Sequence, residues 1–112
     1  MIVLALERGI LLMSDCNSDV LFESRAVYLC RTGGLRLKKD KMEVINRDGD
    51  ITEEFMLDDM RDIRKRGHTC IVWNYGDNSF ESHIAILDFQ RENWLDALEK
   101  AKAGKYEEIV YA

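Results

Sequence analysis

Apolar and polar residues alternate along the middle of the chain, and this pattern predicts a series of short antiparallel strands. Leu35 and Leu37 alternate with Arg36 and Lys38, which is the period of a strand with one inward face and one cationic outward face. Because turn-forming residues separate the β-type runs, sequential hairpins in a meander are the simplest topology. The other predicted strands cover residues 20–31, 42–45, 51–57, 69–75 and 80–89.

Three short segments are predicted to shape this meander. Thr32-Gly33-Gly34 is expected to supply the positive φ angles of a tight hairpin. Leu57, Met60 and Ile63 recur at intervals of three, which predicts a single helical or 3₁₀ turn at a corner between strands. We interpret residues 64–68 as a polar crossover that leads from this corner into the next strand.

One amphipathic helix is predicted near the end of the chain, from Gln90 to Lys102. Trp94, Ala97, Leu98 and Ala101 recur at helical spacing, so one stripe of the helix is apolar and can cover a sheet. Asp88 is a candidate N-cap and Gly104 a natural stop. Strands first and one helix last indicate an α+β domain, with Trp73 and Trp94 in its core.

Length and composition suit one domain of 112 residues without proline. We expect a core from residue 20 to 103, an N-terminal extension at 1–19 and a tail at 104–112. The apolar opening carries Glu7 and Arg8 and lacks a basic start, so it resembles neither a signal peptide nor a membrane span. Three cysteines without a C-x-x-C pair favour free thiols in the cytoplasm.

Positive charge is concentrated in two clusters on a chain whose net charge is -5. Such an acidic protein is a poor general binder of nucleic acid, but local basic clusters can recognise an acidic partner or headgroup. The alternative is that these side chains are ordinary solvated charges, which also discourage edge pairing of strands. The first cluster contains Arg31, Arg36, Lys38, Lys39 and Lys41, and the second contains Arg61, Arg64, Lys65 and Arg66.

Two further groups of residues are candidates for chemical sites. If the hairpin is centred between Gly76 and Asp77, Cys70 and His83 fall opposite each other, with His68 on the same face. A thiol beside imidazoles could serve a metal or a nucleophile, but neither set is complete, and an ordinary cross-strand group is favoured. Residues 46–51 superficially resemble a calcium loop, but Val44 and Phe55 occupy positions that need acidic ligands. We therefore expect no metal and no cofactor.

The order of these segments resembles pleckstrin-homology-like domains, especially the bacterial PH and GRAM type. The resemblance covers about residues 20 to 103 and rests on the patterns at Gly34–Leu37, Met42–Ile45, Phe55–Ile63 and Asn93–Leu98. It implies a barrel of two antiparallel sheets, about seven strands in all, closed by the C-terminal helix. Phosphoinositide-binding members place Lys and Arg beside an open loop between strands, as Arg36, Lys38 and Lys39 could do here.

The expected function is therefore a non-enzymatic binding or adaptor module with a protein partner. Its contact surface would be the two basic clusters or an edge strand that accepts a peptide. Two alternatives stay open, namely binding of anionic lipid headgroups at the first cluster and a small enzyme using Cys70 with His83. A homo-oligomer formed through the apolar termini also stays open.

Overall fold

The computed structural model describes residues 19–77 and 80–109, and seven of its segments are strands. All neighbouring strands pair antiparallel in the order β4-β3-β2-β1-β7-β6-β5. The α+β prediction is thus confirmed as one seven-stranded sheet with a C-terminal helix. The strands are β1 (Phe22–Tyr28), β2 (Arg31–Leu37), β3 (Lys41–Ile45), β4 (Ile51–Met56), β5 (Met60–Arg66), β6 (Cys70–Tyr75) and β7 (Glu81–Ile86).

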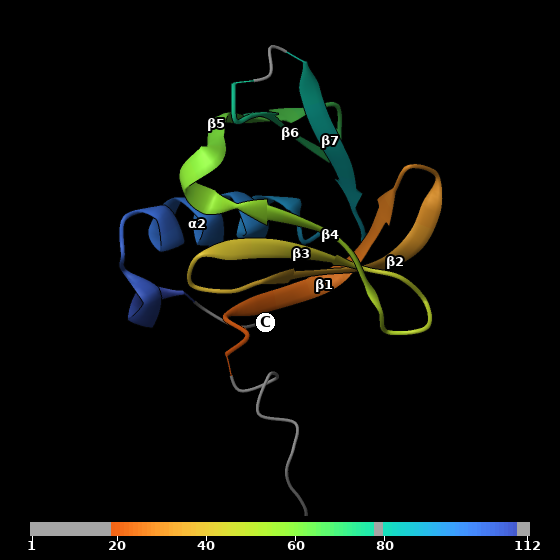
Figure 1. Cartoon of the computed structure of the whole chain (residues 1–112), viewed down its shortest axis with the longest axis horizontal. Coiled ribbons are helices and arrows are strands. Elements are labelled where there is room, and N and C mark those ends of the chain that lie inside the picture. The colour runs from red at the N-terminus through yellow and green to blue at the C-terminus, as the bar shows by residue number, and fades with distance from the viewer. Residues whose placement is uncertain (1–18, 78–79, 110–112) are drawn as a thin grey trace, which may run out of the picture.

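Edge strands β4 and β5 are not paired with each other, so the backbone ladder does not close into a ring. They are joined by the 3₁₀ turn η1 (Leu57–Asp59), where Leu57 and Met60 are buried. This confirms a 3₁₀ turn at the predicted corner, but Met60 and Ile63 lie in β5 and not in the turn. In Figure 1, β5, β6 and β7 occupy the upper part of the molecule and β1 to β4 the lower part, with α2 (Arg91–Lys102) at one side between them.

The core lies where the helix meets the inner faces of the strands. Trp94 is fully buried, stands edge-on to the ring of Phe22 at 5.1 Å, and donates from Nε1 to the Ser24 hydroxyl at 2.7 Å. A second aromatic group centres on Phe55, whose ring lies 5.0 Å from Trp73 and 5.1 Å from Tyr75. The predicted helical stripe of Trp94, Ala97, Leu98 and Ala101 is buried throughout.

The β1–β2 turn is not where the glycines predicted it. Leu29 and Cys30 form the turn, with φ of 50° and 65°, while Gly33 and Gly34 lie inside β2. A Cβ on Gly33 would stand 2.1 Å from the carbonyl oxygen of Ile45. Gly33 is therefore required by close approach of β3, and not by turn geometry.

The predicted polar crossover at residues 64–68 is also wrong, because β5 continues through Arg66 and the turn follows it. A bulge places Asp62 and Ile63 opposite Trp73, and Asp62 has a φ of 54°. The extra residue breaks the period-two pattern, which is why this charged edge strand did not resemble a strand.

Smaller differences concern the last hairpin and the helix start. Strand β7 begins at Glu81 and ends at Ile86, short of the predicted Phe89, and Phe80 is 76% exposed. Asp88 is not the N-cap, since Gln90 holds that position and Asp88 instead accepts bonds from Arg25 at 2.6 and 2.8 Å. Gly104, with a φ of 77°, ends the helix as predicted.

Several predictions fall outside the described residues. These are the N-terminal extension at 1–19 apart from Asp19, the thiol of Cys16, and the last three residues of the tail. Within the described ranges, no helix is long and apolar enough to cross a membrane. The described part of the tail forms the 3₁₀ turn η2 (Tyr106–Glu108), and Tyr106 packs against the core.

Candidate functional site

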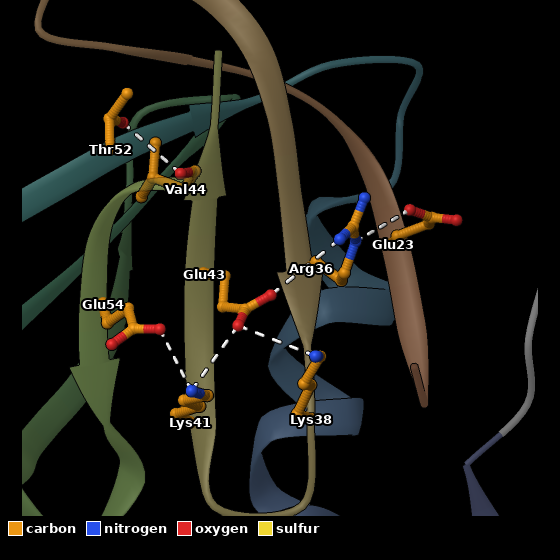
Figure 2. Close-up of polar contacts among 8 residues, drawn as sticks. All are labelled: Glu23, Arg36, Lys38, Lys41, Glu43, Val44, Thr52 and Glu54. Carbon is orange, nitrogen blue, oxygen red and sulfur yellow. Dashed lines mark hydrogen bonds and ion pairs between the residues drawn. The ribbon is translucent and has the colours of Figure 1, made fainter. Parts of the chain in front are cut away.

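Most of the first basic cluster surrounds a buried carboxylate that sequence reasoning did not single out. The side chain of Glu43, on β3, is 1% exposed. Charged nitrogens of Arg36, Lys38 and Lys41 lie 3.9, 3.7 and 3.6 Å from its oxygens. Figure 2 shows the three side chains pointing toward Glu43. Three of the five predicted contact cations therefore stabilise an internal charge.

Strand register explains why these groups meet. Glu23, Arg36, Glu43 and Glu54 lie directly opposite one another on β1, β2, β3 and β4, so they form one row across the outer face of the sheet. Lys41, two residues before Glu43 on β3, bonds to Glu54 at 3.0 Å, and this bond raises the pKa of Lys41. Cross-strand pairs of opposite charge stabilise a sheet, and the row leaves little free positive charge.

The second basic cluster is likewise engaged within the domain. Arg64 and Arg66, on β5, both bind Glu81 on β7, and Arg66 does so at 2.9 Å. Their bonds, with that of Arg66 the larger cause, lower the pKa of Glu81. Arg61 donates to the carbonyl of Gly76, and Lys65 lies 3.8 Å from Glu92. The two clusters thus pair with different carboxylates, Glu43 for the first and Glu81 for the second.

Two members of the first cluster stand apart from Glu43. The ammonium of Lys39 lies 5.3 Å from the centre of the Tyr106 ring, a cation–π contact. Arg31 is exposed and has no ion pair within the described ranges. It lines a hollow of about 450 Å³ together with Arg47, which was not among the predicted contact residues. Thr32, Asn46, Asp48 and the thiol of Cys30 complete this lining.

The predicted cross-strand group of His68, Cys70 and His83 is wrong in register. Cys70 lies opposite Ala85, and His83 lies opposite Val72, so the hairpin is shifted by two positions from the predicted pairing. His68 belongs to the turn between β5 and β6. In the part of the chain that the structure describes, no three His, Cys, Asp or Glu side chains are placed to hold a metal ion.

The outer edge of β5 is covered by the domain's own side chains. Lys102, at the end of α2, donates to the carbonyls of Leu57 and Met60 at 2.6 and 2.8 Å. Arg91, at the start of α2, donates to Gly67 at 2.6 Å, and Arg64 donates to the carbonyl of Asp62 at 2.6 Å. These bonds occupy carbonyls that an added strand would need.

An apolar groove of about 570 Å³ runs between β5 and α2. Met60, Ile63, Leu95 and Leu98 supply its apolar lining. Because the carbonyls on its strand side are already bonded, a peptide in this groove would gain little from backbone pairing with β5.

The edge of β4 is open by comparison. Leu57 donates to the Asp40 carbonyl at 2.9 Å, and the alternation of antiparallel pairs then turns the N–H and C=O groups of Glu54 and Met56 outward. The Met56 N–H is bonded by the Tyr75 hydroxyl at 2.8 Å. Within residues 19–77 and 80–109, no side chain bonds to the outward backbone groups of Glu54.

Beside β4 lies a hollow of about 440 Å³ that contains the half-buried Glu53. Tyr28, Thr32, Val44 and Thr52 also line it. Burial, followed by the charge of Glu53, raises the pKa of Tyr28 above its ordinary value of 10.0. Glu53 itself has no ion pair among the described residues. The open edge thus carries an unneutralised carboxylate.

Comparisons with known proteins add no family assignment. No protein-family model matches the chain, and no curated protein matches its sequence.

Proposed function

We propose that this chain is a non-catalytic binding module that recognises a protein partner by adding a strand from that partner to β4. The observation that carries the proposal is the difference between the two sheet edges. Glu54 presents an outward N–H and C=O without a protein partner among the described residues. On β5, by contrast, the carbonyls of Met60, Asp62 and Arg66 accept bonds from side chains of the domain, namely those of Lys102, Arg64 and Arg91. An extended peptide gains main-chain hydrogen bonds at such an open edge.

The fold type belongs to the same proposal. Seven antiparallel strands, a corner at η1 and a helix that closes one side follow the order expected of a PH-like barrel. Proteins that share one fold can have unrelated functions, so the binding role is supported by the site and not by the fold. The exposed thiol of Cys30 suits a reducing compartment, and we place the module in the cytoplasm.

The two basic clusters support the proposal less well than the open edge. Arg36, Lys38 and Lys41 lie around Glu43, and Arg64 and Arg66 bind Glu81. A partner that recruited these cations would have to break existing ion pairs. At Glu43 it would also leave a buried carboxylate with fewer cations to stabilise its charge. Arg31 and Lys39 are the exceptions, since neither contacts Glu43 in the described structure.

A proline substitution provides the test. Glu54→Pro removes the outward N–H without removing a bond to β3, and proline is tolerated at sheet edges. Peptides selected from a displayed random library on the wild-type domain should bind Glu54→Pro at least about tenfold more weakly. The matched variant Glu54→Val also removes the carboxylate but keeps the N–H, so it should bind these peptides more tightly than Glu54→Pro does. Peptides that bind the proline variant equally well, or a selection that yields none, would refute strand addition at β4.

Binding of anionic lipid headgroups is a second candidate function. It is favoured because Arg31 and Arg47 line the same hollow. Both residues line the hollow of about 450 Å³, and neither has an ion pair among the described residues. Arg presents a planar fork of donors that suits phosphate. Sedimentation with phosphatidylserine vesicles at low salt should retain the wild type and release Arg31→Gln/Arg47→Gln. Equal retention of the two proteins, or no retention, would remove this candidate.

A further inference from the structure

We infer that the partner strand carries two consecutive basic residues, which pair with Glu53 and Glu54 on the two faces of the extended sheet. This inference rests on the proposed strand addition at β4 and specifies its partner. It depends on the orientation of the two carboxylates, on the charge of the edge, and on the hollow that contains Glu53.

The side chains of Glu53 and Glu54 lie on opposite faces of the sheet. Neighbouring residues of a strand point to opposite faces. Glu54 lies on the outer face, opposite Glu43 and bonded to Lys41, whereas Glu53 lines the hollow beside Tyr28. Two adjacent residues of an added strand also point to opposite faces. A basic pair at these positions would therefore meet one carboxylate on each face, whether the partner runs parallel or antiparallel to β4.

The segment that contains β4 is strongly acidic. From residue 47 to 59 the chain contains one arginine and six acidic residues, so this segment alone matches the net charge of the protein. An edge of this sign attracts a cationic strand. It also disfavours a second copy of the chain, because antiparallel pairing of β4 with β4 would bring glutamates together, and like charges directly opposite each other destabilise a sheet. The acidic residues are Asp48, Asp50, Glu53, Glu54, Asp58 and Asp59.

The hollow that contains Glu53 offers space for a side chain of the partner. Its volume of about 440 Å³ can receive a long basic side chain, whose stem would lie on Tyr28 and Val44 while the cation reaches the carboxylate. Glu54 already has Lys41 at 3.0 Å, so its attraction for a further cation is smaller. Arg31 lines the same hollow, and its positive charge opposes an incoming cation. Glu53 is thus the main determinant, and Arg31 limits the affinity.

Labelled peptides of about eight residues, the length of a typical strand, test the inference by fluorescence anisotropy. The probe alternates threonine and valine around a central lysine–arginine pair, and the reference has two glutamines there. At about 50 mM NaCl the basic peptide should bind wild type at least about tenfold more tightly than the reference, and the preference should fall with salt.

Variants locate the preference on the domain. Glu53→Gln should reduce it more than Glu54→Gln does, and the double variant should reduce it below about threefold. Arg31→Gln should increase the affinity for the basic peptide. The matched control Asp58→Asn/Asp59→Asn removes two charges from η1, away from the hollow, and should leave the preference largely in place.

The outcomes separate this inference from the proposed function. If the reference peptide binds, loses binding to Glu54→Pro, and is matched by the basic peptide, strand addition stands and the basic pair is refuted. If neither peptide nor any selected peptide depends on the β4 backbone, both are refuted. A preference that survives Glu53→Gln/Glu54→Gln but disappears in the η1 control also refutes the proposed pairing.

Discussion

Glu43 and Arg36 face each other across β3 and β2, and the Glu43 side chain is 1% exposed although it lies 3.9 Å from the guanidinium of Arg36. Lys38 and Lys41 approach the same carboxylate at 3.7 and 3.6 Å. Without the negative charge of Glu43, three cationic side chains would lie close together around an uncharged group. The row across the outer sheet face therefore depends on this one acidic residue.

Replacing that carboxylate should reveal its contribution. Glu43→Gln keeps the shape of the side chain and removes its charge, so we expect the free energy of unfolding to fall by about 2 kcal/mol. Urea denaturation measures the change. Glu54→Gln, at a side chain that is 44% exposed, should cost less than about 1 kcal/mol. Equal midpoints for Glu43→Gln and wild type would show that the buried charge does not stabilise the sheet.

Adjacent glycines of β2 should respond differently to the same substitution. Gly33→Ala would place its Cβ 2.1 Å from the Ile45 carbonyl oxygen, and we expect a loss of about 3 kcal/mol through overpacking. At Gly34 the nearest atom is 3.5 Å away, so Gly34→Ala should be neutral or stabilise by up to about 1 kcal/mol. Thermal melts of the two variants compare them directly. Similar melting temperatures would contradict the close approach of β2 and β3.

The helix docking can be tested at Trp94. Trp94→Ala should lower the free energy of unfolding by about 3–5 kcal/mol, because a fully buried ring and its bond to Ser24 are lost. Phe89→Ala is the matched control, since Phe89 is 101% exposed and its removal should change stability by less than about 0.5 kcal/mol. An unchanged melt for Trp94→Ala would count against the packing of α2.

Acid should weaken the link between β5 and β7. Bonds from Arg66 and Arg64 lower the pKa of Glu81 below its ordinary value of 4.5. A carboxyl whose folded pKa is depressed stabilises the fold fully above that ordinary value, and the stabilisation is lost as pH falls through the folded pKa. Between about pH 5 and about pH 3, Tm should therefore fall less steeply in Glu81→Gln than in wild type.

The control for this pH effect is Glu107→Gln. Glu107 is exposed and has no ion pair among the described residues, so its variant should follow the wild-type curve. If Glu81→Gln shows the same slope as wild type, the arginine pairs on β5 do not contribute to acid sensitivity.

All strands except β5, and the position of the helix, could be predicted from the sequence because hydrophobic periodicity acts locally. The alternation of Leu35 and Leu37 and the stripe containing Trp94 correspond to buried faces. The corner at Leu57 was recognised for the same reason. These features depend on residues within one or two turns of the chain, and no distant partner alters them.

Register and bulges could not be predicted, because both depend on contacts between strands. Leu29 and Cys30 adopt positive φ angles without being glycine or asparagine, so the turn had no compositional signal. The bulge at Asp62 concealed β5, and a shift of two positions separated Cys70 from His83. Local alternation alone carries no information on which residues face each other.

The candidate site was missed for a related reason. Cationic clusters are visible in a sequence, but their neutralisation by Glu43 and Glu81 appears only when separate strands are aligned. Glu53 and Glu54 were not among the predicted contact residues. Nothing in the linear pattern distinguishes an edge strand whose backbone is open from one covered by Lys102 and Arg91.

Lys102 and Arg91 also couple two events that would otherwise be independent. They hold opposite ends of α2 against opposite ends of β5, through the carbonyls of Met60 and Gly67. Local opening of the helix would uncover the apolar core and unsatisfied strand carbonyls at the same moment. The locally opened form would thus expose apolar surface together with a strand edge that can pair with another copy of the chain. The rate of aggregation should therefore follow the frequency with which the helix undocks.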